Sequence, residues 1–134
     1  MAKVLGVGGF FYKSADPAAA RAWYTRVLGF EFQPWGGLAF TPDEMAAKKG
    51  SATVWNVMKP DSDYPAPSTR EFMINLVVDD MDAVLARAKA EGVEPVKLFP
   101  DEGFGRFAHI LDPDGIKLEL WEPSAQEDEA PAAE

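Results

Sequence analysis

The chain has 134 residues, of which 47% are hydrophobic and 26% charged, a composition typical of one small folded domain rather than a disordered chain. Its lack of cysteine excludes disulfides, thiolate metal sites and a cysteine nucleophile, and its single histidine excludes a metal site built from several histidines of one chain. A formal net charge of −9 argues against binding to nucleic acid or to an anionic membrane surface, so we expect neither as a partner.

Both ends of the chain carry little structural signal. The N-terminal apolar run is too short to span a bilayer and has no cleavage pattern, so we expect a cytoplasmic protein. From Glu122 onward the chain holds acidic residues and no lysine or arginine. A segment rich in Pro, Ala and Glu buries too little apolar surface to offset its ordering entropy, so we expect residues 124–134 to be a disordered acidic tail.

The same pattern occurs at residues 10–32 and again at 74–96. In each copy a short extended run ends in an acidic residue, Asp16 or Asp80, which is suited to cap the first turn of a helix. A stretch with helical spacing follows and ends at a glycine, as helices commonly do. The repeat predicts one helix in each half of the chain.

The remaining apolar runs have the composition of strands. In the first half, residues 36–40 and 52–58 are expected to form a hairpin; in the second half, residues 104–111 and 116–122 form another. A proline-rich, polar connector at 59–70 separates the halves. The sequence therefore predicts an α+β fold with the order β-α-β-β-β in residues 1–58 and again in residues 71–123.

The segment Asp-Pro-Asp-Gly at 112–115 predicts the register of the second hairpin. Proline fits the second position of a type I turn, and the glycine supplies the positive φ of a three-residue loop with a bulge. In this register His109 faces Glu119 and Phe107 faces Trp121, while the other face collects the apolar residues Ala108, Ile110, Leu118 and Leu120. A two-residue loop would mix polar and apolar residues on both faces.

These features resemble the vicinal oxygen chelate superfamily, which includes glyoxalase I, extradiol dioxygenases and bleomycin-resistance proteins. The resemblance is carried by residues 15–32, 77–96 and 105–123. It implies two βαβββ modules whose strands form a cupped, barrel-like mixed sheet with the helices outside. It also implies a small-molecule ligand in the cup and a homodimer.

The resemblance further implies a metal site with four ligands, which this sequence keeps only in part. The glutamate of the final strand corresponds to Glu119, whereas Gly9 and Met73 stand at the ligand positions of the two first strands. The last strand of the first module, near residues 53–56, offers no carboxylate. With three of four ligands missing, we expect no cofactor, and Glu119 is the metal ligand if a divalent ion binds.

Strand alternation predicts which side chains line the cup. His109 and Glu119 are the candidate catalytic pair, as a general base and the group that orients it, or else a structural hydrogen bond across the hairpin. Lys13 is a candidate for binding an anionic group. The remaining candidate ligand contacts are Phe11, Trp55, Met73, Asn75, Phe107 and Trp121.

Three functions remain open from the sequence. The first is a glyoxalase-like enzyme that moves a proton on a small carbonyl or aromatic compound without a metal, or with an atypical metal site of the lyase or dioxygenase kind. The second is a binding protein that sequesters a planar or cationic compound between aromatic walls, as in bleomycin resistance. The third is a dimeric scaffold whose cavity is filled by side chains.

Overall fold

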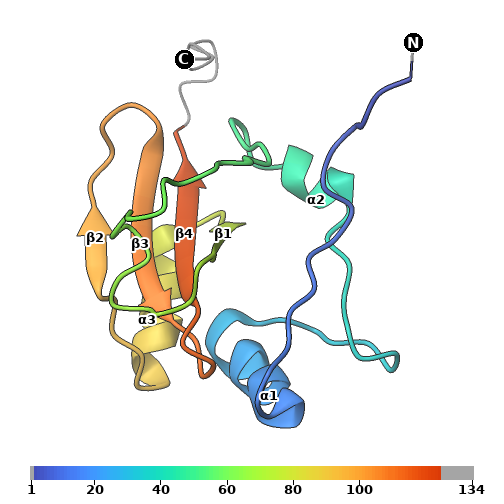
Figure 1. The fold of residues 1–134 in the computed structure, drawn as a ribbon, viewed down its shortest axis with the longest axis vertical. Coiled ribbons are helices and arrows are strands. Elements are labelled where there is room, and N and C mark those ends of the chain that lie inside the picture. Colours follow the sequence, from blue (N-terminus) through green and yellow to red (C-terminus); the bar gives the residue numbers. More distant parts are fainter. Residues whose placement is uncertain (1, 125–134) are drawn as a thin grey trace.

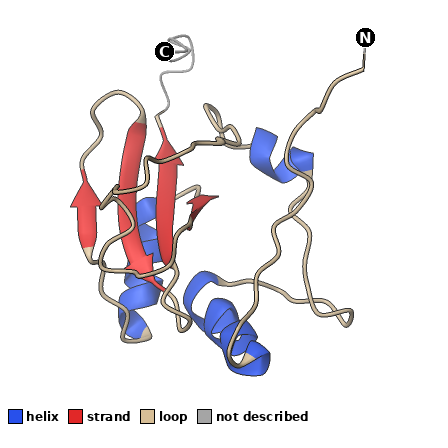
Figure 2. Cartoon of the chain, in the orientation of Figure 1, coloured by secondary structure: helices blue, strands red, loops and turns tan. Residues whose placement is uncertain are grey.

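The computed structural model of the protein describes residues 2–124 and consists of one mixed sheet with helices outside it (Figures 1 and 2). The expected acidic tail lies almost wholly outside the described residues. The elements in chain order are α1 (Pro17–Leu28), α2 (Pro42–Ala46), β1 (Met73–Val77), α3 (Met81–Ala90), β2 (Lys97–Phe99), β3 (Gly105–Leu111) and β4 (Lys117–Pro123).

The four strands have the order β1-β4-β3-β2. Strand β1 is parallel to β4, whereas β3 is antiparallel to both β4 and β2. The sheet is open, with β1 and β2 at its edges, and α3 lies beside it in Figure 1. The α+β class with a mixed sheet and outer helices is therefore confirmed, and all four strands come from the part expected to be the second module.

The turn at residues 112–115 sets the hairpin of β3 and β4 as its sequence predicts. Gly115 has φ 76°, and the carboxylate of Asp112 accepts the amides of Asp114 and Ile116, both at 2.8 Å. The backbone amide of Asp112 donates to the carbonyl of Ile116 at 3.0 Å, which closes the bulged loop. The predicted pairing of His109 with Glu119 follows and is confirmed.

The two longer helices begin and end where their capping residues predict. Asp16 and Asp80 each accept a backbone amide in the first turn at 3.1 Å, which satisfies donors that a helix N-terminus leaves free. Gly29 after α1 and Gly92 after α3 have φ of 75° and 83°, a left-handed conformation that glycine adopts without strain.

The core lies on one face of the β3–β4 hairpin. Fully buried side chains of both strands pack there with Met81 of α3 and Tyr24 of α1. The Tyr24 hydroxyl donates to Asp112 at 2.6 Å, so α1 is tied to the hairpin turn by a buried hydrogen bond. The hairpin residues of this core are Ala108, Ile110, Leu118 and Leu120.

The prediction of strands in the first half of the chain is wrong. Residues 2–72 contain no strand, and the segments 36–40 and 52–58 form no ladder. The backbone turns at Gln33–Gly37, and the segment expected as a hairpin loop forms α2, where Thr41 and Glu44 make a capping box. Strand composition produces a strand only where a neighbouring strand supplies hydrogen bonds, and within one chain these segments have none. The boundaries of the two modules remain a prediction.

Candidate functional site

A row of polar side chains crosses the sheet on the face opposite the core. Strand pairing aligns Lys97 of β2 with His109 of β3, His109 with Glu119 of β4, and Glu119 with Asn75 of β1. Side chains of a strand alternate between the faces, so these four point to the same side. The predicted residues His109, Glu119 and Asn75 are thus brought together.

An aromatic row runs beside the polar one. It lies two residues away from the polar row on each strand and consists of three aromatic residues and one valine: Phe99, Phe107, Trp121 and Val77. The rings of Phe107 and Trp121 are parallel within 2°, with centroids 6.0 Å apart, and the Trp121 indole donates to the carbonyl of Phe104 at 2.8 Å. The sheet therefore presents a polar strip next to an aromatic surface.

Glu119 is the centre of the polar row because three side chains donate to its carboxylate. Asn75 Nδ2 donates to Oε1 at 2.8 Å, while His109 Nε2 at 2.9 Å and the Tyr64 hydroxyl donate to Oε2. Burial acts to raise the pKa of Glu119, but the hydrogen bonds from His109, Tyr64 and Asn75 outweigh it and hold the pKa below its ordinary value. Glu119 is therefore an ionised acceptor at neutral pH.

His109 is held as a donor to that carboxylate. An ionised carboxylate only accepts hydrogen bonds, so the ring proton lies on Nε2, and Nδ1 is a buried atom without a partner among the described residues. The residue has 0% of its surface exposed. In this arrangement Nε2 contacts Glu119 and so orients its carboxylate, while Nδ1 is buried. A role of His109 as a general base remains a prediction.

Tyr64, which no pattern in the sequence predicts as a site residue, reaches the site from the connector between the two halves. Lys117 fixes the connector there, because its Nζ donates to the carbonyls of Tyr64 and Ala66, each at 2.7 Å. Burial and then the nearby Lys97 lower the pKa of Lys117. Burial and the hydrogen bond to Glu119 raise the pKa of Tyr64, so its hydroxyl stays protonated and donates.

Of Tyr64 and Lys117, only Lys117 could have been predicted as a site residue from the sequence. It lies two residues before Glu119 on β4, and alternation places both on the same face. The position of Tyr64 in space depends on the path of the connector, which carries no periodic pattern from which to predict it.

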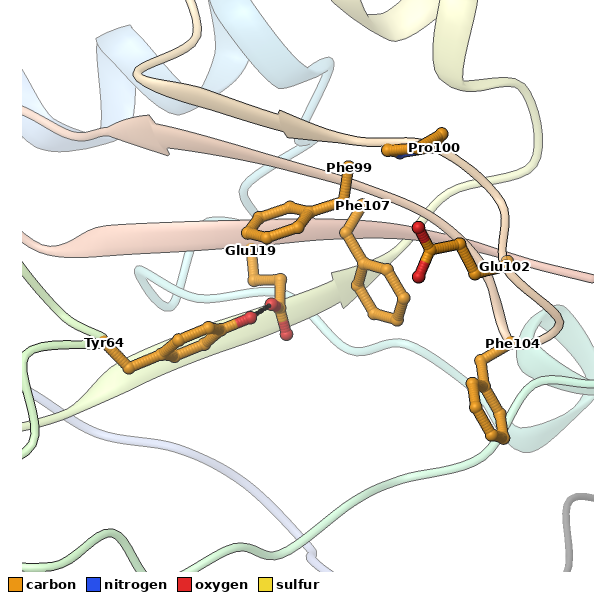
Figure 3. Close-up of a pocket in the computed structure, with 8 residues that line it drawn as sticks. Tyr64, Phe99, Pro100, Glu102, Phe104, Phe107 and Glu119 are labelled. Atoms are coloured by element: carbon orange, nitrogen blue, oxygen red, sulfur yellow. Dashed lines mark hydrogen bonds between the residues drawn. The ribbon is translucent and has the colours of Figure 1, made fainter.

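A cavity of about 280 Å³ opens between Tyr64 and the aromatic row (Figure 3). In Figure 3 the Tyr64 ring reaches Glu119 on one side, and the Glu102 carboxylate lies on the other side of the Phe107 ring. Half of the eight lining residues are aromatic, and two carboxylates are the acidic groups. The lining residues are Tyr64, Phe99, Pro100, Glu102, Phe104, Gly105, Phe107 and Glu119.

Four predicted ligand contacts do not line this cavity and belong to neither the polar nor the aromatic row. Phe11 and Trp55 expose 93% and 81% of their surfaces, and Lys13 is also exposed. Met73 lies on β1, paired with Lys117 at the far side of the polar row from the aromatic surface. The roles of these four residues as ligand contacts remain predictions.

The donors at the site do not fit a metal centre with four hard ligands. Within residues 2–124 no group of three or more His, Cys, Asp or Glu side chains is placed to hold an ion. Gly9 has no side chain, Met73 offers only a soft thioether, and the Glu119 oxygens already accept three hydrogen bonds. Whether an ion binds in solution stays a prediction.

No helix among the described residues is long and apolar enough to cross a membrane. The cytoplasmic location and the absence of a nucleic-acid partner stay predictions.

Comparison with known proteins gives one family. The family model of the Glyoxalase/Bleomycin resistance protein/Dioxygenase superfamily matches residues 10–120. A comparison with curated protein sequences found no match.

Solved structures of this kind resemble the chain at low sequence identity. TnmS3, an antibiotic-binding protein from Streptomyces sp. CB03234, aligns with a TM-score of 0.57 and 24% identity over 92% of this chain and 100% of its own. A glyoxalase/bleomycin resistance protein from Catenulispora acidiphila aligns with a TM-score of 0.46 and 30% identity over 81% of this chain and 90% of its own. A lactoylglutathione lyase from Agrobacterium tumefaciens aligns with a TM-score of 0.47 and 20% identity over 80% of this chain and 85% of its own.

Proposed function

This chain belongs to the Glyoxalase/Bleomycin resistance protein/Dioxygenase superfamily, and we propose that it binds a small aromatic compound in the cavity beside Glu119. The observation that carries the proposal is the aromatic wall next to an ionised carboxylate. Small-molecule sites commonly combine an apolar, aromatic lining with a few polar groups that fix the orientation of the ligand. The antibiotic-binding TnmS3, which shares the fold, is consistent with a ligand of this kind.

The walls favour a planar ligand that carries a hydrogen-bond donor. The edges and faces of Phe99, Phe107 and Phe104 suit an aromatic ring, and Glu119 and Glu102 accept donors or pair with a positive charge. Glu119 faces the cavity already ionised and positioned by three donors, so binding requires little rearrangement of this group.

Substitution of the cavity wall tests the binding function. Titrating the protein with indole and with 4-aminobenzamide in a calorimeter should give saturable binding that Phe107→Ala weakens at least about tenfold. Leu98→Ala is the matched control, because Leu98 lies on β2 next to Phe99 but points to the opposite face. The absence of measurable binding of both compounds, or equal affinity in the Phe107→Ala and native proteins, would rule the proposal out.

A second candidate function is proton-transfer chemistry of the lyase or isomerase type. It is supported by a carboxylate and a phenol hydroxyl that meet at the cavity, where Glu119 takes a proton from a substrate and Tyr64 donates to the oxygen that gains charge. The low pKa of Glu119 makes it a weak base, which favours binding over catalysis. Turnover of a carbonyl substrate that is unchanged in Glu119→Gln and His109→Ala would exclude this chemistry.

We also propose that the protein is a homodimer. Large apolar side chains of the first half are exposed, and the strand-like segments that hold them have no ladder within one chain. A second copy of the chain supplies strands of matching composition and covers these side chains. Sedimentation equilibrium should give twice the monomer mass; a monomer at micromolar concentration would contradict the proposal. The exposed residues include Val4, Leu5, Phe11, Val54, Trp55 and Val57.

A further inference from the structure

A second cavity, of about 270 Å³, lies along the polar row on the lysine side of His109. Two of the residues that line it, Lys97 and Lys117, are cationic, and Tyr64 lines both this cavity and the aromatic one. Asp63 and Ala66 of the connector complete the lining with His109. The two cavities therefore share one aromatic side chain as a wall and differ in the charge of their other groups.

The ammonium group of Lys117 forms no ion pair among the described residues; Lys97 repels its charge, and Glu119 and Asp63 attract it from beyond ion-pair distance. Lys117 is 3% exposed, and its ammonium group donates to two backbone carbonyls, which leaves one of its three donors unused. The ion pairs among the described residues include neither Lys117 nor Lys97. A buried charge normally makes a direct ion pair, and Lys117 makes none among the described residues although the chain has a net charge of −9.

Lys97 is the second cation at this place. Its ammonium group lies 5.2 Å from the centroid of the Phe99 ring, which holds it at the boundary between the aromatic row and the lysine cavity. Asp63 is the one carboxylate in the lining. It is exposed, so water screens its charge far more than that of the buried Lys117.

We propose that the lysine cavity binds a carboxylate group of the same ligand whose aromatic ring occupies the first cavity. The inference rests on the proposed binding function and extends it, because it gives the ligand class as aromatic acids that also carry a hydrogen-bond donor. The ring contacts Phe99 and Phe107, the donor reaches Glu119, and the carboxylate lies between the ammonium groups of Lys97 and Lys117.

A pair of matched ligands tests the subsite. Binding of 4-aminobenzoate is compared with that of 4-aminobenzamide, which has nearly the same shape but no charge. The chain has a single histidine, so the ring signal of His109 in an NMR spectrum reports directly on the lysine cavity. The benzoate should bind at least about fivefold more tightly than the amide and should shift this signal.

Lys97→Gln provides the decisive variant, because Lys97 is exposed and its loss leaves the anchoring of the connector by Lys117 intact. The preference for the benzoate should fall below about twofold in Lys97→Gln and stay unchanged in Lys89→Gln, a lysine in the last turn of α3. A preference that survives in Lys97→Gln, or equal affinities in the native protein, would overturn the inference while leaving the aromatic site in place. If neither compound bound, the proposed function itself would fail.

Discussion

Replacing Glu119 by glutamine should lower the free energy of unfolding by about 2 kcal/mol at neutral pH. The glutamine carbonyl can occupy the place of Oε2 and accept from Tyr64 and His109, and its amide group then faces Asn75. Turning the Asn75 amide over presents its oxygen, so all three hydrogen bonds persist without the charge. Each bond loses about 1 kcal/mol when its acceptor becomes neutral, and about 1 kcal/mol is regained because a charge is no longer buried.

The same replacement should change the pH dependence of stability. The folded pKa of Glu119 lies below its ordinary value, so this group stabilises the fold above the ordinary carboxyl range and the contribution is lost as pH falls through the folded pKa. Urea unfolding of native and Glu119→Gln proteins from pH 7 down to pH 3 should show a difference that shrinks toward acid. Equal stability at pH 7, or a difference independent of pH, would refute this reasoning; the exposed Glu94→Gln is the control.

Three further substitutions have defined outcomes. Tyr24→Phe removes the donor to a buried carboxylate at the hairpin turn and should cost about 2 kcal/mol in urea unfolding, and no change would contradict this bond. Gly105→Ala places a methyl group against the Glu122 carbonyl at φ 112°, so the thermal midpoint should fall by several degrees, whereas an unchanged midpoint would contradict this packing. Tyr64→Phe removes one donor to Glu119, which raises the pKa of that carboxyl and should move the acid limb of the stability profile to higher pH; an unmoved limb would contradict that hydrogen bond.

The hairpin that holds the site was predictable because its determinants are local. The turn at 112–115 selects a bulged loop, and the separation of polar from apolar residues selects the same register. From these two signals alone the pairing of His109 with Glu119 follows. Asn75 also joins them as predicted, because alternation along β1 places it on the same face.

The rest of the site, and the structure of the first half of the chain, depend on contacts between residues that are distant in the sequence. Tyr64 enters the site because Lys117 binds the connector carbonyls, and no periodic pattern in residues 59–70 gives that path. The strands expected at 36–40 and 52–58 have suitable side chains, but a ladder also needs a partner strand, and composition does not identify one. The contact of His109 Nε2 with Glu119 and the burial of Nδ1 required the distances in the folded chain.

A crystal structure of the protein with bound 4-aminobenzamide would test the central claim most directly. We expect the ring of the compound against Phe99 and Phe107, with its amino group donating to the carboxylate of Glu119. Density for the compound at another surface, with the aromatic cavity empty and the hydrogen bonds of Glu119 unchanged, would contradict the account.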